Sequence, residues 1–92
     1  MTPIVIWNDA NIAHVAAHSI TPFEFEEVLL DDALPTVLSR SSGRPMKFGN
    51  TSTGKHICVV WVEVKISPLT LLPVTAYDAP KPRNIRRRGR KK

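Results

Sequence analysis

The chain has 92 residues, 42% of them hydrophobic, and a formal net charge of +5 at pH 7. This length fits one small domain, and a domain of this size buries so little surface that self-association or a partner is expected. The longest apolar run, "ICVVWV", is too short to cross a membrane, and the start, "MTPIVIWND", lacks the basic leader of a signal peptide. The sequence therefore predicts a soluble, cytoplasmic protein.

A short strand and a helix are expected first. The β-branched run "PIVIW" at 3–7 predicts a strand, and Asn8 or Asp9 after it can cap a helix that continues to about residue 18. The apolar stripe expected along this helix consists of Ile12, Val15 and Ala16. Helical spacing aligns three polar residues along the edge of that stripe: Asn11, His14 and His18.

The second helix has the clearest start signal in the chain. Thr21 at the N-cap, Pro22 at the first helical position and Glu24 three residues after the cap form a capping box with a well-placed proline. The helix is expected to reach about residue 30 and to end at "DDALP". The side chains that it is expected to bury are Phe25, Val28 and Leu29.

From residue 36 onward the pattern predicts strands separated by turns. "TVLSR" and "PMKFGNTS" flank the turn "SSGR", and "KHICVVWVEVKI" gives the strongest strand signal. Because its first half is apolar on both faces, this strand is expected at the centre of the sheet. The last strand, "LTLLPVTAY", contains Pro73, which indicates an edge position or a bulge. The order β-α-α-β-β-β-β predicts an α+β domain, with two helices packed on a mostly antiparallel sheet of four or five strands.

Most of the positive charge follows these strands. Residues 79–92 carry eight Lys or Arg and no acid, whereas residues 1–78 carry five Lys or Arg and eight Asp or Glu. Such a run of like charges is typical of a flexible arm, and it attracts phosphate without reading sequence. We therefore divide the chain into a folded domain, 1–78, and a basic tail, 79–92, with an arm that has no fixed ligand as the alternative. The candidate RNA contacts in the tail are Arg83, Arg86 and Arg87.

The cysteine and histidine pattern does not predict a metal site. Cys58 lies in an apolar run and is expected to be a small buried residue. His14 and His18 have the spacing of two ligands on a helix, but only "VAA" lies between them and no third ligand follows at zinc-site spacing. We therefore expect no metal and no other cofactor. The two histidines either lie at the edge of the core, or at least one of them acts at the helix end.

Three segments together resemble the BrnT family of ribonuclease toxins. They are "WNDANIAHVAAHSITPFEFEEVL", "FGNTSTGKHICVVW" and "PVTAYD", and they follow the order and intervals of the family pattern from about residue 5 to residue 78. The resemblance implies a RelE-like fold and a type II toxin that cleaves RNA and inhibits translation. It also implies a ribbon-helix-helix antitoxin encoded nearby. A toxin–antitoxin hetero-oligomer and a homodimer are both compatible with it.

The resemblance also implies which residues act. His18 stands where the family has a histidine, and a general acid or base of this type suits neutral pH. Lys55 stands where the family usually has arginine, and it would hold the phosphate. Tyr77 takes the place of a further arginine, where it would stack on a base or donate a proton, and Ala17 takes the place of a lysine. The cations expected to make up for the lost charge toward RNA are Arg44 and Lys47.

These departures from the family pattern leave two functions open. Lys55 lacks the bidentate fork of arginine, and two other family cations are missing. The first interpretation is an active, metal-independent endoribonuclease. The alternative is a catalytically weakened nucleic-acid-binding or antitoxin-type interaction module of the same fold. Independently of these departures, a third hypothesis is a pure interaction protein whose acidic helices pair with a basic partner. Plainer roles are also open for the other residues, since Tyr77 can simply cover the core, and Arg44 and Lys47 can lie at a solvated strand edge.

Overall fold

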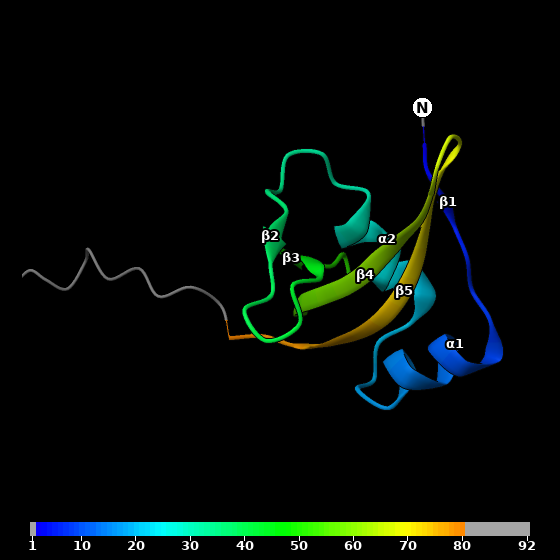
Figure 1. Ribbon diagram of the computed structural model, residues 1–92. Coiled ribbons are helices and arrows are strands. Elements are labelled where there is room, and N and C mark those ends of the chain that lie inside the picture. Colours follow the sequence, from blue (N-terminus) through cyan, green and yellow to red (C-terminus); the bar gives the residue numbers. More distant parts are fainter. Residues whose placement is uncertain (1, 81–92) are drawn as a thin grey trace, which may run out of the picture.

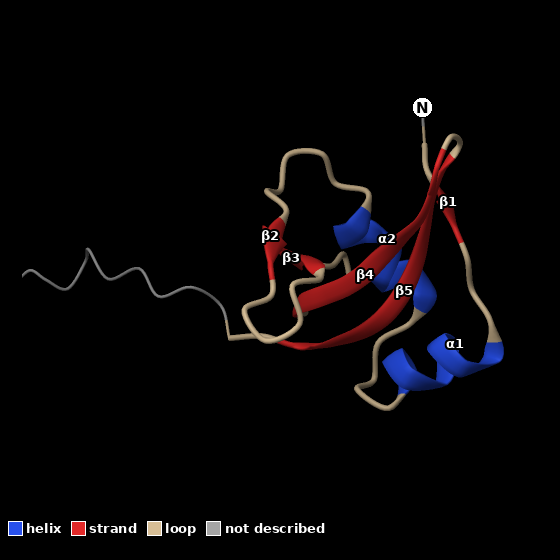
Figure 2. Ribbon diagram, in the orientation of Figure 1, coloured by secondary structure: helices blue, strands red, loops and turns tan. Residues whose placement is uncertain are grey.

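The computed structural model describes residues 2–80 and shows two helices beside a five-stranded sheet (Figure 1). The element order agrees with the β-α-α-β-β-β-β order expected from the sequence, and so does the α+β class (Figure 2). The elements are β1 (Ile4–Val5), α1 (Asp9–Ala16), α2 (Pro22–Leu29), β2 (Val37–Leu38), β3 (Pro45–Asn50), β4 (His56–Ile66) and β5 (Leu69–Asp78).

The sheet has the strand order β1-β5-β4-β3-β2, and only the short β1–β5 pair is parallel. The central position expected for β4 is confirmed, because a strand that is apolar on both faces is best placed between neighbours. Of the two settings expected for Pro73, an edge position and a bulge, the structure shows the bulge, since β5 lies between β1 and β4. Val60 pairs with Thr75 while the next residue, Trp61, pairs with Pro73, so β5 carries one extra residue at this point. Proline fits there because it has no N–H to donate to the sheet.

Both helices begin at the capping residues that the sequence indicates. The backbone N of Asn11 donates to the Asn8 side chain over 2.9 Å, and the backbone N of Asn8 donates to the Asn11 side chain over 2.8 Å. The same reciprocal pattern joins Thr21 and Glu24 over 3.1 and 3.0 Å at the start of α2. These bonds satisfy backbone donors that a helix cannot satisfy internally. The first helix ends at Ala16, somewhat earlier than expected.

The two helices pack on the same face of the sheet. Phe25 of α2 meets Trp7 edge to face, with 5.2 Å between the ring centroids. The expectation that α2 buries Phe25, Val28 and Leu29 is confirmed. The core between helices and sheet consists of Val15, Ile20, Phe25, Val28, Leu29, Ile57, Val59, Trp61, Leu71 and Ala76.

The apolar stripe expected on α1 is wrong for two of its three residues. Ile12 is 39% exposed and Ala16 is also exposed, so of the three only Val15 is buried. The second buried residue of α1 is polar: Asn11, whose Nδ2 donates to the carbonyl of Pro73 over 3.3 Å. This short helix meets β5 through a hydrogen bond as well as through apolar packing, which the hydrophobic pattern does not reveal.

Alternate residues of β3 and β4 point away from the helices. Ile57 and Val59 lie in the core, so Cys58 between them faces the other way. Lys47 donates to backbone carbonyls at the end of α2, so its neighbour Phe48 also faces away. We call this second surface the open face of the sheet. It consists of Met46, Phe48, Asn50, His56, Cys58, Val60, Thr75 and Tyr77.

Cys58 is fully buried on this face, as expected. Among residues 2–80, the structure contains no helix of the length and apolarity that a bilayer span requires.

Candidate functional site

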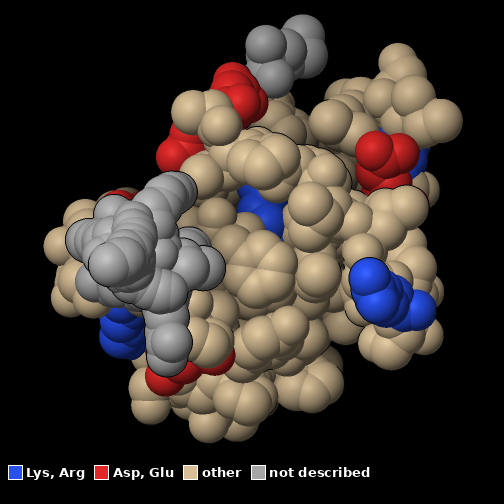
Figure 3. Space-filling model, turned by 90° about the vertical axis from the view of Figure 1, so that its left-hand side faces the viewer, with Lys and Arg blue, Asp and Glu red and all other residues tan. Residues whose placement is uncertain are grey.

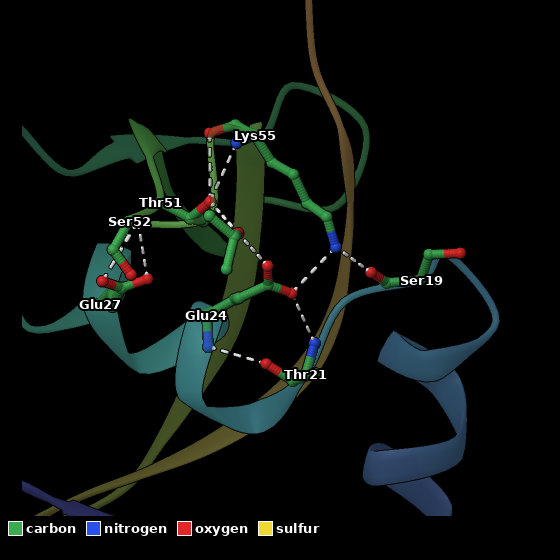
Figure 4. Close-up of polar contacts among 8 residues, drawn as sticks. Ser19, Thr21, Glu24, Glu27, Thr51, Ser52 and Lys55 are labelled. Carbon is green, nitrogen blue, oxygen red and sulfur yellow. Dashed lines mark hydrogen bonds and ion pairs between the residues drawn. The ribbon is translucent and has the colours of Figure 1, made fainter.

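A polar network on the helix side joins the α1–α2 loop to the turn between β3 and β4 (Figure 4). We call it the Glu24 clasp, formed by Ser19, Thr21, Glu24, Thr53 and Lys55. The Lys55 ammonium lies 3.1 Å from Glu24 Oε1 and also donates to the Ser19 carbonyl. The Thr53 hydroxyl donates to the other carboxylate oxygen of Glu24. Glu24 is only 2% exposed, so its carboxylate is largely removed from water, whereas the Lys55 side chain is partly exposed.

The Glu24 clasp keeps its carboxylate ionised. The hydrogen bond from Thr53, aided by the bonds from the Thr21 backbone and Lys55, lowers the pKa of Glu24 from 4.5 to about 2, although burial opposes this change. A carboxylate that accepts several hydrogen bonds is stabilised in its charged form. The positive charge of Lys55 is therefore balanced by the Glu24 carboxylate, which makes Lys55 a poor candidate for neutralising a bound phosphate.

The same turn has a second attachment to α2. The backbone N of Ser52 donates to both oxygens of Glu27, over 3.1 and 3.3 Å. Thr51 is buried, and its hydroxyl accepts from the backbone N of Lys55 over 3.0 Å. The segment 51–55 is thus held by side chains at both of its ends. The sequence "NTSTGK" therefore builds a structural turn that positions the start of β4.

The three catalytic residues expected from the sequence do not converge. His18 is exposed and directly precedes Ser19, whose carbonyl binds Lys55, so these two candidates lie at the same corner of the helix side. Tyr77 lies on the open face, where it pairs with Cys58 and is 38% exposed. The sheet therefore lies between Tyr77 and the Glu24 clasp.

The expected RNA-binding residues are also separated. Lys47 is only 7% exposed, and its ammonium donates to the carbonyls of Leu29 and Asp31 over 2.8 and 2.9 Å. It caps the end of α2, whose last carbonyls have no partner within the helix, and so it is not on a surface that RNA can reach. Arg44 is exposed just before β3, at the opposite end of that strand from Asn50. The tail residues lie outside the described part of the chain: Arg83, Arg86 and Arg87.

A different polar pair lies at the end of the open face. His56 Nδ1 is 2.9 Å from Asn50 Oδ1. Because an amide oxygen only accepts, Nδ1 is the donor in this contact, and Nε2 is the ring nitrogen left for a substrate. The backbone N of Ala79 donates to the His56 carbonyl over 2.9 Å, while Tyr77 pairs with Cys58, so His56 and Tyr77 are diagonal neighbours. Diagonal pairs on one face of an antiparallel sheet lie roughly 7–8 Å apart.

Tyr77 remains protonated at neutral pH. A hydrogen bond with the Cys58 thiol raises the pKa of Tyr77, and burial raises it further. Burial likewise raises the pKa of Cys58. The open face therefore brings together the His56 imidazole and a phenol that retains its proton.

Sequence reasoning missed His56 because it weighed the histidines by their spacing on a helix. The informative signal was strand alternation: in "KHICVVW", His56 precedes Cys58 by two residues and so shares its face. Asn50 ends the preceding strand across the turn "TSTG", where it meets His56. Within residues 2–80, no three His, Cys, Asp or Glu side chains are grouped as ligands for a metal ion. The chain matches no protein-family model, no curated protein and no solved structure.

Proposed function

We propose that the protein is a toxin-type endoribonuclease of the RelE-like class that cleaves RNA on the open face of its sheet and so inhibits translation. The observation that carries this proposal is the His56–Asn50 pair with Tyr77 as its diagonal neighbour on the same face. The resemblance of three segments to BrnT toxins supports the same activity. The proposed catalytic groups are His56 and Tyr77, rather than His18 and Lys55.

These two side chains can supply both proton transfers of a metal-independent cleavage. His56 Nε2 takes the proton from a ribose 2′-hydroxyl, and the 2′-oxygen then forms a bond to the adjacent phosphorus. The bond from phosphorus to the 5′-oxygen breaks, and the Tyr77 hydroxyl donates its proton to that leaving oxygen. The products are a 2′,3′-cyclic phosphate and a 5′-hydroxyl. Diagonal neighbours such as His56 and Tyr77 start roughly 7–8 Å apart on the two strands, which leaves room for the phosphate between the imidazole and the phenol.

Charge on the reacting phosphate requires cations nearby. Lys55 is bound by Glu24, and Lys47 is buried at the end of α2, so neither is available for this role. The sequence supplies eight Lys or Arg in residues 81–92. Arg83 follows Tyr77 by six residues, so its backbone lies within roughly 20 Å of Tyr77 even when the chain is fully extended. We assign phosphate binding to this tail, with Arg83, Arg86 and Arg87 as its contacts.

A single-turnover cleavage assay tests the assignment. The full chain should cleave unpaired RNA in the presence of EDTA, and folded His56→Ala should react about 10²- to 10⁴-fold more slowly, the usual loss for a general acid–base group. His14→Ala is the matched control, because His14 is an exposed histidine on α1. A rate loss confined to His18→Ala would move the base to the end of α1 and contradict the open-face site. Cleavage that is abolished by EDTA and restored by a divalent ion would contradict the mechanism.

The ion pair between Lys55 and Glu24 also favours a second candidate function, because it leaves Lys55 a poor partner for the reacting phosphate. In that case the protein binds RNA through its tail and open face without cleaving it. RNA binding with intact RNA after long incubation would support this module and exclude the ribonuclease. Both functions are compatible with a ribbon-helix-helix partner encoded nearby. Co-elution with that partner and a raised melting temperature would support the toxin–antitoxin assignment, whereas an unchanged melting temperature without co-elution would remove it.

A further inference from the structure

Three side chains form a row across the open face. Phe48 of β3 pairs with Cys58 of β4, which in turn pairs with Tyr77 of β5. Phe48 is 40% exposed and Tyr77 is 38% exposed, whereas Cys58 between them is fully buried. Two strand spacings separate the aromatic side chains, so they lie roughly 10 Å apart. We call these three residues the aromatic row.

The surroundings of the aromatic row are apolar. The solvent-facing side of an antiparallel sheet usually carries polar residues, because water covers it. Here the neighbouring positions hold Met46 and Val60, and the open face as defined above contains no Asp, Glu, Lys or Arg. Figure 3 views the molecule from the side on which β2 and β3 lie. A Lys or Arg side chain is visible near the centre of this view, the other charged side chains lie toward its margins, and uncharged side chains cover most of the remainder. The apolar surroundings of the aromatic row suit an occupant with flat, weakly polar faces.

We infer that the aromatic row binds unpaired RNA by stacking one base on Phe48 and another on Tyr77. The inference rests on the proposed function and names its substrate class. Proteins recognise single-stranded RNA by stacking exposed bases on aromatic side chains, whereas the bases of a duplex already stack on one another. Next along the same face, the His56–Asn50 pair can hydrogen-bond to a base edge or a ribose hydroxyl.

Charge complementarity favours RNA over a protein occupant. Tyr77 ends the row on β5, and the eight Lys or Arg of residues 81–92 follow it in sequence after Pro80. An uncharged stacking surface joined directly to a polycation matches the two parts of a single strand, its bases and its phosphates. A second copy of this chain would bring a second basic tail to the same place, and the two tails would repel each other.

The test measures binding of a fluorescein-labelled 12-nucleotide poly-uridine RNA and of a fully paired RNA hairpin stem, by anisotropy in EDTA. We expect Phe48→Leu, which keeps an apolar side chain but removes the ring, to weaken poly-uridine binding about 5- to 150-fold, the span for one lost stack. The dependence of its affinity on salt should not change, because no charge is removed. Phe23→Leu is the matched control, since Phe23 is 67% exposed on α2. Phe48→Tyr should bind as the parent does, and it covers the case in which Phe48→Leu does not fold.

Cleavage is measured separately with Tyr77→Phe, which keeps the ring and removes the proton donor. If no protein cleaves RNA but Phe48→Leu still binds poly-uridine more weakly, the ribonuclease fails and the aromatic row stands. If Tyr77→Phe cleaves slowly while folded Phe48→Leu binds as the parent does, the aromatic row is refuted and the ribonuclease stands.

Three further results would refute RNA binding by the aromatic row. The first is an equal loss of RNA affinity in Phe48→Leu and Phe23→Leu, and the second is an equal loss of affinity for poly-uridine and for the hairpin. The third is a change in oligomeric mass without a change in RNA affinity. A lower affinity of Phe48→Tyr for poly-uridine would also refute it.

Discussion

Replacing Glu24 by Gln removes the charge at the centre of the Glu24 clasp and keeps the size of the side chain. Gln retains one oxygen that can accept from Thr21, but it can no longer balance the Lys55 ammonium 3.1 Å away. Lowering the pKa of Glu24 from 4.5 to about 2 corresponds to about 3 kcal/mol of stabilisation at neutral pH. Because the Lys55 side chain is 35% exposed, water screens part of this interaction. We therefore expect Glu24→Gln to lower the free energy of unfolding by about 2 kcal/mol at pH 7.

The pH dependence of this loss follows from the direction of the pKa change. The pKa of Glu24 is lower in the folded chain than in the unfolded chain, so the stabilisation is fully present above pH 4.5. It is lost as the pH falls from 4.5 toward about 2, because the unfolded chain takes up its proton first. The difference between the parent and Glu24→Gln should therefore shrink by more than half, to roughly 1 kcal/mol or less, at pH 3.

Urea denaturation of the parent and the variant at several pH values measures this difference directly. Asp32→Asn is the matched control, since Asp32 is an exposed acid that follows α2. The reasoning is refuted if Glu24→Gln costs no more than Asp32→Asn at pH 7. It is also refuted if the cost of Glu24→Gln stays constant from pH 6 to pH 3.

Three other changes have defined expected outcomes. Ser19→Gly should raise the free energy of unfolding by about 1 kcal/mol, because Ser19 has a φ of 61°, which glycine adopts without strain; an unchanged melting temperature would contradict this. Gly49→Ala should lower it by about 1–2 kcal/mol, because the added Cβ would lie 2.6 Å from Leu34 Cδ1 and 3.2 Å from Val28 Cγ1; a denaturation midpoint equal to that of the parent would show that these side chains yield freely. Removing residues 81–92 takes away eight positive charges, so RNA affinity should fall and its salt dependence should flatten; an unchanged salt slope would exclude the tail from phosphate contact.

Local signals in the sequence determined where most elements lie. The capping pattern of Thr21 and Glu24 marks the start of α2 because those side chains bond to backbone groups within one turn. The strand β4 was identified, and placed at the centre of the sheet, because both of its faces are apolar. The missing backbone donor of Pro73 limited its position to an edge or a bulge, and the structure has the bulge. Each of these features depends on neighbours in the chain, so the sequence is enough to predict it.

Only the tertiary structure decided which side of the sheet each polar residue occupies. Strand alternation separates Lys47 from Phe48, but it does not say which of the two faces the helices cover. The packing of α2 turns Lys47 into a buried cap and leaves Phe48 on the open face. In the same way, Glu24 draws Lys55 to the helix side, while His56 and Tyr77 meet on the other. Contacts between residues far apart in the chain depend on the docking of whole elements, which no local pattern encodes.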